Sequence, residues 1–570
     1  MTGLTIRRFF SLCALGLVAL PALAQDAEFE TDDLSAAGAG TVGTLSLENG
    51  GLSVEMWADS NLDRVKFLLG HADVETAAPS MRSLVRKILL TEARLPDGAT
   101  DEDGAKIFAE RVRILFDMGD VIALEGLMER LSQTAPSNFP GYVRINLGQL
   151  LVKEGIETAC AAPGRDSAAP EFGRAWIAKV NAACANLGDR GPDGDVQLEL
   201  AKELGDGDDL FLTLVSKLRG EHEGEVEIPA NATLDPLHIA LMLKTGVTFT
   251  PAHLDQITPD SLVGLARSGR VPALIRAMAA ERALDRGQMA VTDVRPIYNQ
   301  LALQADAGET NVPPEGEATL ARAQAYGHIV IMDDPNGRGR EVVRVLRAAQ
   351  SKMDVDPRAF RILALIYGDL AARIQPSPSA IADAGVLIRA LMTAGKMTEA
   401  GAWHTLVVEQ ARSGLGVALR QLFEIWPLLV VSGPELGSEG ASVLALDWYN
   451  FALQQHGQAG IDKAIAALSL IEAMGEPISA DVWDRIMASR ATSRTTAELP
   501  NLSIWRGVAE AAQNKRQAEA GFLALMMLQG GQLKGAHPVV ISAILGAFLE
   551  AGMEADARAV ARDAMRSLGL

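Results

Sequence analysis

The side chains that most often do chemistry in proteins are spread thinly along this chain. Its eight histidines form neither an H-E-x-x-H nor an H-x-H pattern, and the Glu-His-Glu segment 221–223 lies in a charged stretch that predicts a solvated loop. Asp189, Asp193 and Asp195 stand near two glycines, as in a calcium loop, but their spacing differs from that of an EF-hand and Pro192 interrupts it. We therefore predict no metal site.

Patterns for phosphate binding and nucleophilic catalysis are also missing from the sequence. The Gly-Arg-Gly-Arg segment 337–340 lacks the Lys-Ser/Thr pair of phosphate loops, so we expect a turn that opens a helix. No G-x-S-x-G nucleophile elbow occurs. An active site would need acids or histidines from distant helices to converge, which spacing cannot reveal. The sequence thus predicts no enzyme, no catalytic residues and no cofactor.

The cysteines suggest structural chemistry. Cys13 lies in an apolar run near the N-terminus, which leaves Cys160 and Cys184. Two cysteines in an oxidising compartment pair most simply as one disulfide, and the C-x-x-C spacing of redox enzymes is missing. A bridge between them would close a loop of about 25 residues and contribute roughly 3 to 4 kcal/mol on the chain-entropy model. We expect it to tie the end of one helix to the end of another.

Residues 1–24 have the pattern of a secretory signal peptide. Two arginines precede an apolar run from Phe9 to about Leu20, and the small-x-small pattern Ala-Leu-Ala follows at 22–24. We predict cleavage after Ala24 and export to the periplasm. The run is shorter than the roughly 20 apolar residues that span a bilayer, and later apolar stretches such as Val539–Leu549 are shorter still. No membrane insertion is therefore expected after cleavage.

The composition favours packed helices and argues against nucleic acid as a partner. Hydrophobic residues make up 48% of the chain and aromatic residues only 5%. Alanine and leucine carry most of the apolar content, and both are strong helix formers. Acids outnumber bases 72 to 52. Such a surface repels phosphate backbones and anionic lipid headgroups.

Helical periodicity begins near Asn61 and recurs as hairpins. An apolar residue is followed by a glycine four positions later and by an alanine after four or five more. The copies are Leu115/Gly119/Ala123, Leu151/Gly155/Ala159, Leu265/Gly269/Ala273, Leu391/Gly395/Ala400 and Phe548/Gly552/Ala557. The first two begin 36 residues apart, close to the tetratricopeptide (TPR) period. We predict an all-α, TPR-like, irregular α-solenoid of stacked hairpins. The alternative is ordinary helical bundles with glycine at helix ends.

Composition changes divide the chain into four parts. After the signal peptide, residues 25–58 are acidic and then rich in glycine and alanine, which predicts a flexible linker. Residues 59–305 form an N-terminal helical-repeat half and residues 317–570 a C-terminal one. The boundary, 306–316, contains several acids and two consecutive prolines. Most of the tryptophans fall in the C-terminal half, where we expect them in the core.

One stretch resembles a known group of proteins. Its matching residues are Trp176, Cys184, Gly188, Asp189, Leu200 to Leu204, Asp208, Asp209, Phe211 and Leu214 to Gly220. Together they resemble a family of secreted, helix-rich alphaproteobacterial proteins with no assigned activity. The hairpin at 391–403 is similar to the C-terminal repeats of that family. The resemblance implies a periplasmic helical-repeat protein and supplies no catalytic residues.

The predicted fold favours a binding role. Stacked hairpins expose long concave surfaces that usually bind other proteins. We therefore predict a periplasmic scaffold or assembly factor for protein partners of the cell envelope, such as a flagellar motor or secretion system. That function predicts a large groove lined by apolar or aromatic side chains. The alternative is a glycan- or small-ligand-binding module, which predicts a closed pocket with a few polar groups beside tryptophans.

Overall fold

The computed structural model describes most of the chain as helices. The described residues are 40–132, 140–162, 174–187, 192–204, 208–308, 312–353, 356–433, 441–489 and 499–570. They contain 26 α-helices, and the only extended pairings among them are two isolated bridges. The prediction of an all-α fold is confirmed. None of the helices in these ranges is long and apolar enough to cross a membrane.

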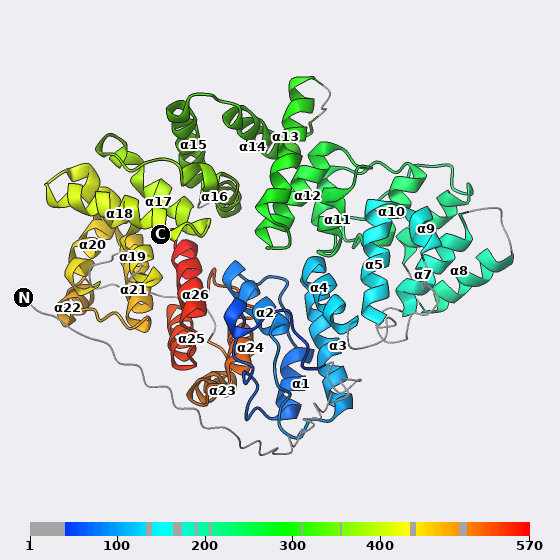
Figure 1. Ribbon diagram of the computed structural model, residues 1–570, viewed down its shortest axis with the longest axis horizontal. Coiled ribbons are helices and arrows are strands. Elements are labelled where there is room, and N and C mark those ends of the chain that lie inside the picture. Colours follow the sequence, from blue (N-terminus) through cyan, green and yellow to red (C-terminus); the bar gives the residue numbers. More distant parts are fainter. Residues whose placement is uncertain are drawn as a thin grey trace, which may run out of the picture.

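The helices follow one another around the molecule in five groups (Figure 1). The lower group in that view comprises α1 (Leu62–Gly70), α2 (Pro79–Leu90), α3 (Asp101–Asp117) and α4 (Val121–Ser132). The right-hand group comprises α5 (Pro140–Lys153), α6 (Ile156–Ala161), α7 (Arg174–Ala185), α8 (Pro192–Leu204), α9 (Asp209–Leu218) and α10 (Pro236–Thr245).

The chain then crosses the top of Figure 1 and descends on the left. The upper group comprises α11 (Ser261–Arg267), α12 (Ala273–Asp285), α13 (Val291–Asp306), α14 (Pro314–Val330), α15 (Pro335–Gln350) and α16 (Pro357–Ala371). The left-hand group comprises α17 (Ala384–Thr393), α18 (Met397–Arg412), α19 (Gly416–Ser432), α20 (Ala441–His456), α21 (Gln458–Ala473) and α22 (Ala480–Ala488). The last group comprises α23 (Leu502–Gln513), α24 (Gln517–Met527), α25 (Pro538–Glu550) and α26 (Glu554–Ser567).

All five glycine-marked hairpins are confirmed. They are α3–α4, α5–α6, α11–α12, α17–α18 and α25–α26, and in each the two helices pack on one another. Gly119 shows why glycine is needed at the first bend. Its φ of 69° lies in the left-handed region, and an added Cβ would stand 2.3 Å from the carbonyl carbon of Pro259. Segment 337–340 lies at the start of a helix, α15, as predicted, but it is part of the helix and not a turn before it.

The array of hairpins closes on itself. Helix α1 packs on α24, and α2 packs on both α24 and α26, so the blue and red ends of the described chain lie side by side in Figure 1. At this closure Glu519 is fully buried. Its carboxylate accepts hydrogen bonds from Arg64 at 2.6 Å and from the Ser60 hydroxyl at 3.1 Å. The solenoid is thus a closed ring with a shared apolar core.

The second part of the predicted linker is docked on this closure. Residues 40–58 cross α2 and α3, and the buried guanidinium of Arg111 donates hydrogen bonds to the carbonyls of Gly40, Val42 and Leu89. Trp57 is buried and stacks with Phe522 at 6.1 Å between ring centroids. The prediction of a flexible linker is therefore wrong for 40–58, because its few apolar side chains anchor it. Residues 25–39 and the predicted signal peptide, 1–24, lie outside the described residues.

The predicted boundary between the two halves is a packed junction. Helix α13 ends at Asp306 and α14 begins at Pro314, and the two helices pack against each other. Across them Tyr298 and Tyr326 make an edge contact at 6.1 Å. Residues 309–311 lie outside the described residues. The two halves therefore touch both here and at the ring closure. The expectation that most tryptophans are core is met at Trp403, Trp426 and Trp448.

Candidate functional site

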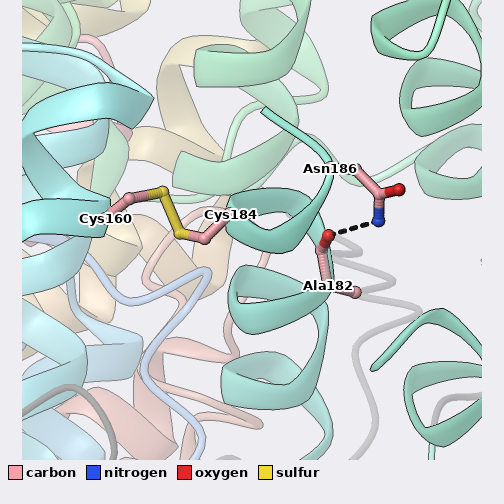
Figure 2. The surroundings of a disulfide bond; sticks show 4 residues. All are labelled: Cys160, Ala182, Cys184 and Asn186. Carbon is pink, nitrogen blue, oxygen red and sulfur yellow. Dashed lines mark hydrogen bonds between the residues drawn. A yellow bond between two sulfur atoms is a disulfide. The ribbon is translucent and has the colours of Figure 1, made fainter. Parts of the chain in front are cut away.

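The predicted disulfide holds a helix that lies beside the candidate site. Cys160 and Cys184 are bonded, with their Cα atoms 5.5 Å apart, and the bond joins the last turns of α6 and α7 (Figure 2). Just beyond it, Asn186 donates a hydrogen bond of 2.6 Å to the carbonyl of Ala182 and ends the helix. The prediction that a disulfide ties two helix ends together is confirmed.

Helix α7, held in this way, reaches α9 and α10 through two polar side chains. The indole nitrogen of Trp176 donates to Asp235 at 2.8 Å, and the ammonium of Lys179 donates to Asp208 at 2.8 Å. Both acids also cap helices, because Asp208 accepts from a backbone amide of α9 and Asp235 from two amides of α10. The disulfide-bonded helix is thereby locked to the two helix starts beside the site.

A buried histidine joins the same two acids. His238 lies 2.8 Å from Asp235 through Nδ1 and 3.2 Å from Asp208 through Nε2. Burial by itself favours the neutral imidazole, but the two carboxylates overcome this effect and raise the pKa of His238 to about 10. The imidazolium is therefore paired on both sides, so this cluster supports the site and leaves no free base.

In front of this cluster lies a cleft of about 660 Å³. Two loops, 230–235 and 255–260, form its floor and are joined by a parallel bridge between Leu234 and Ile257. The last turn of α3, the side chain of Arg144 from α5, and the α1–α2 loop at 72–75 complete the wall. The close contact of Gly119 with Pro259 places the α3–α4 bend against the floor. Five chain segments therefore converge on one cleft.

The cleft is strongly acidic. One guanidinium lines it, that of Arg144, whose Cζ lies 4.5 Å from the ring centroid of Phe116 and 5.4 Å from that of Trp176. Six carboxylates also line it: Asp73, Glu75, Asp117, Asp235, Asp255 and Asp260. Three of these acids have a cationic partner, since Asp117 pairs with Arg113 and Asp255 with Arg282, each at 2.7 Å, and Asp235 pairs with His238 at 2.8 Å. The remaining charge favours a cation in the cleft.

The deepest acid in the cleft is held partly protonated near neutral pH. Asp260 is 6% exposed, and burial raises its pKa to about 6 against a hydrogen bond from Thr258 that lowers it. Burial also raises the pKa of Asp117, even though Arg113 is close by. A cation that enters the cleft would favour the ionised form of Asp260 and release its proton.

The chemistry of the cleft suits an organic cation better than a metal ion. Within the described ranges, no group of three or more His, Cys, Asp or Glu side chains is arranged to hold a metal. In the Glu-His-Glu segment considered from sequence, the two glutamates are exposed and the histidine is half-buried, and Asp195 pairs with Arg219 at 2.7 Å. Asp189 lies outside the described residues. Spaced carboxylates beside aromatic faces instead match the amines and hydroxyls of a small molecule.

Sequence reasoning did not find this cleft. Its acids come from the α1–α2 loop, the end of α3 and two later loops, so no local spacing marks them. The one available signal was Trp176 beside the disulfide, because that tryptophan bonds to Asp235 at the edge of the cleft.

Comparison with known proteins assigns no family to the chain. No protein-family model, no curated protein and no solved structure matches it. The resemblance to secreted alphaproteobacterial proteins stays a prediction from residues.

A second surface is apolar. A groove of about 170 Å³ between α18, α19 and α20 is lined by Val408, Leu422 and Leu444 among others. Beside it the start of α19 exposes Val417 (47%) and Leu419 (42%). Exposed apolar side chains that adjoin a groove are typical of a contact surface for another protein.

Proposed function

We propose that this protein is a periplasmic small-ligand-binding module whose acidic cleft takes an amine-bearing organic molecule. One observation carries the proposal: six carboxylates and a single guanidinium line a cleft of about 660 Å³. That volume falls within the roughly 300–1,000 Å³ of ligand pockets. The proposal adopts the alternative that the sequence left open, because the polar cleft lies beside a tryptophan.

Two observations support the compartment. The first residues have the pattern of a cleavable export signal, and the disulfide requires oxidising conditions to form and persist. A binding role is favoured over a catalytic one because His238, the one imidazole at the site, is paired with two acids and cannot act as a free base.

The test is calorimetric titration of the chain 25–570 with spermidine, glucosamine and glucose at pH 7.5. We expect the amines to bind and neutral glucose not to bind, with affinity that falls as salt is added. Asp260→Asn should weaken amine binding about tenfold, as expected for loss of a charge-assisted contact. Asp462→Asn, which removes an exposed acid on α21, is the matched control.

Three results would count against the proposal. If glucose and glucosamine bound with equal affinity, the charge of the amine would contribute nothing to binding. Equal affinities of the Asp260→Asn and Asp462→Asn variants would place the ligand elsewhere. Absence of binding by either amine would reject the amine class.

The apolar groove beside α19 favours a second function, the scaffold for envelope proteins. Its test is crosslinking of the tagged chain in its native host, followed by identification of the proteins that co-purify. We expect a reproducible partner from one envelope complex to co-purify with the natural chain. The Val417→Glu variant should not retain this partner, because its carboxylate would be buried unpaired in the contact surface. Exposed Val196→Glu on α8 is the control. Recovery of the same partner with both variants would reject this surface.

A further inference from the structure

A second pocket lies at the centre of the ring, where its ends meet. Its volume is about 370 Å³. The wall comes from the α1–α2 loop at 76–79, the end of α12, the start of α16, segment 532–534 and the last turns of α26. In Figure 1 these helices, α2, α12, α16 and α26, surround the middle of the molecule. The pocket therefore exists only when the ring is closed.

The charge of this pocket is opposite to that of the protein. Four cationic side chains line it: Arg358, Arg361, Lys534 and Arg566. Only two acids do so, Asp285 and Asp563, whereas the whole chain carries a net charge of −20. A local excess of positive charge in so acidic a protein is costly without a counter-charge, because like charges repel most strongly where water is partly excluded.

The two acids do not neutralise the pocket. Asp563 is shared between the backbone amide of Ser80 and the guanidinium of Arg566, each at 2.8 Å. Asp285 lies 3.8 Å from Arg361, which is too far for a hydrogen bond. The Nη1 of Arg361, which is the atom that Asp285 approaches, is buried and has no hydrogen-bond partner among the described residues. A buried donor on a charged group without an acceptor is where an anionic ligand would bind.

A further layer of arginines surrounds the pocket. Behind Arg361, the guanidinium of Arg82 has a pKa lowered to about 10 by burial and by the nearby charge of Arg286. Burial lowers the pKa of Arg286 too, and the charge of Arg358 adds to this effect. The first turn of α16 holds no acid after the N-cap Asp356, and Arg358 and Arg361 follow near the helix end that is already positive.

Part of the lining of the pocket is apolar. Ala77, Met353, Phe360 and Leu533 contribute to its lining. A simple inorganic anion would leave these apolar side chains in contact with water, whereas a molecule with a hydrocarbon part would cover them. The combination of an arginine cluster with an adjoining apolar wall is that expected for an acidic headgroup carried on a short apolar chain.

We propose that the central pocket binds an anionic amphiphile, a carboxylate or phosphate on a short hydrocarbon chain. Arg361 and Arg566 hold the acid group, and the apolar chain lies on Phe360 and Leu533. The pocket is separate from the acidic cleft, so this site does not depend on the proposed function. Since α2, α16 and α26 all contribute to it, the bound ligand would also stabilise the closed ring.

The test is calorimetry of the chain 25–570 at low salt with octanoate and octyl phosphate, with octanol, octylamine and inorganic phosphate as comparison probes. We expect both acids to bind more tightly than any of the three comparison molecules. If octanol bound as tightly as octanoate, the arginines would contribute nothing to binding. If inorganic phosphate bound as tightly as octyl phosphate, the apolar wall would contribute nothing. Either result, or absence of binding by both acids, overturns the proposal.

Two variants locate the site. Arg361→Gln should weaken octanoate binding about tenfold or more, the usual loss for a charge-assisted hydrogen bond, yet leave Tm unchanged or higher because it relieves repulsion. Arg506→Gln, on the exposed side of α23, is the control and should bind as the natural chain does. A lower Tm with unchanged octanoate affinity in Arg361→Gln would show a structural arginine and reject the site. Phe360→Leu should weaken octanoate binding but not that of inorganic phosphate.

Discussion

At the scale of single residues, the chain places ionisable groups where burial alone changes their chemistry. Asp260 in the cleft and Arg361 in the central pocket are both poorly compensated within the protein. Glu519 and His238 are buried as well, but each has two charged partners. Buried groups with two charged partners stabilise the fold, whereas buried groups without full compensation can still bind a ligand.

Asp260 gives a prediction on pH. Its folded pKa, about 6, is higher than the ordinary aspartate value of 3.8, so the folded state binds the proton more tightly than the unfolded state. Its contribution to stability is therefore gained as pH falls from 7 to 4, and lost as pH rises through 6. Asp260→Asn should stabilise the protein at pH 8 by about 2–3 kcal/mol and have little effect at pH 4. Urea unfolding at the two pH values measures this, and an equal effect at both would contradict it.

The disulfide was predictable from residues, whereas the acid cleft was not. Cys160 and Cys184 are the cysteines that remain beyond the predicted signal, so compartment and count were enough to pair them. Asp260 carries no such mark. Its role depends on Gln149, whose amide donates to the Asp260 carbonyl at 3.1 Å from 111 residues away, and on other contacts of the same range.

At the scale of elements, glycine at helix ends was enough to predict the hairpins. Composition was not enough to predict that the second part of the linker, residues 40–58, is docked; this segment is called the arm below. Gly119 and Gly155 have positive φ at the bends where they were predicted. The arm is rich in small residues, yet Met56 and Trp57 are buried. A few apolar side chains decide whether such a segment docks, and average composition hides them.

The hairpin bend at Gly119 can be tested by one substitution. Gly119→Ala should destabilise the protein by at least about 1 kcal/mol, because alanine disfavours positive φ and its Cβ would collide with Pro259. Gly246→Ala is the matched control. Gly246 has a similar φ of 72°, and nothing lies near its added Cβ. Thermal unfolding compares the two, and equal losses would show that contact with Pro259 contributes nothing.

The disulfide acts on an element as well. Cys160→Ser with Cys184→Ser should lower the free energy of unfolding by about 3 kcal/mol on the chain-entropy model. The end of α7 should also exchange its amide hydrogens faster, because the bond fixes it to the last turn of α6. Reductant should lower the Tm of the natural chain and leave that of the double variant unchanged. A natural chain insensitive to reductant would contradict this.

At the scale of the whole molecule, closure of the ring is the feature that sequence could not show. The hydrogen bond from Ser53 to Gln517 spans 464 residues, and no periodicity within hairpins reports on such a contact. Each hairpin predicts only that it packs on its neighbours. The twist that accumulates along the whole array, which determines whether the ends meet, depends on packing details that the sequence pattern does not contain.

Glu519 tests the closure. Glu519→Gln should destabilise the protein by about 3–5 kcal/mol, because Arg64 and Arg516 would lose a buried partner. Glu550→Gln, an exposed change on α25, is the control and should cost little. Small-angle scattering should show a larger radius for Glu519→Gln if the ring opens before the hairpins melt. A change in stability without any change in radius would mean that closure and folding are one event.

The meeting of the two ends also has a consequence in time. At about 5–20 residues per second, tens of seconds separate the synthesis of α1 and α2 from that of α24 and α26. Throughout that interval the parts of α1 and α2 that pack on α24 and α26 have no permanent cover, since these two later helices do not yet exist. The closure of the ring therefore has to wait until the last hairpin has been made.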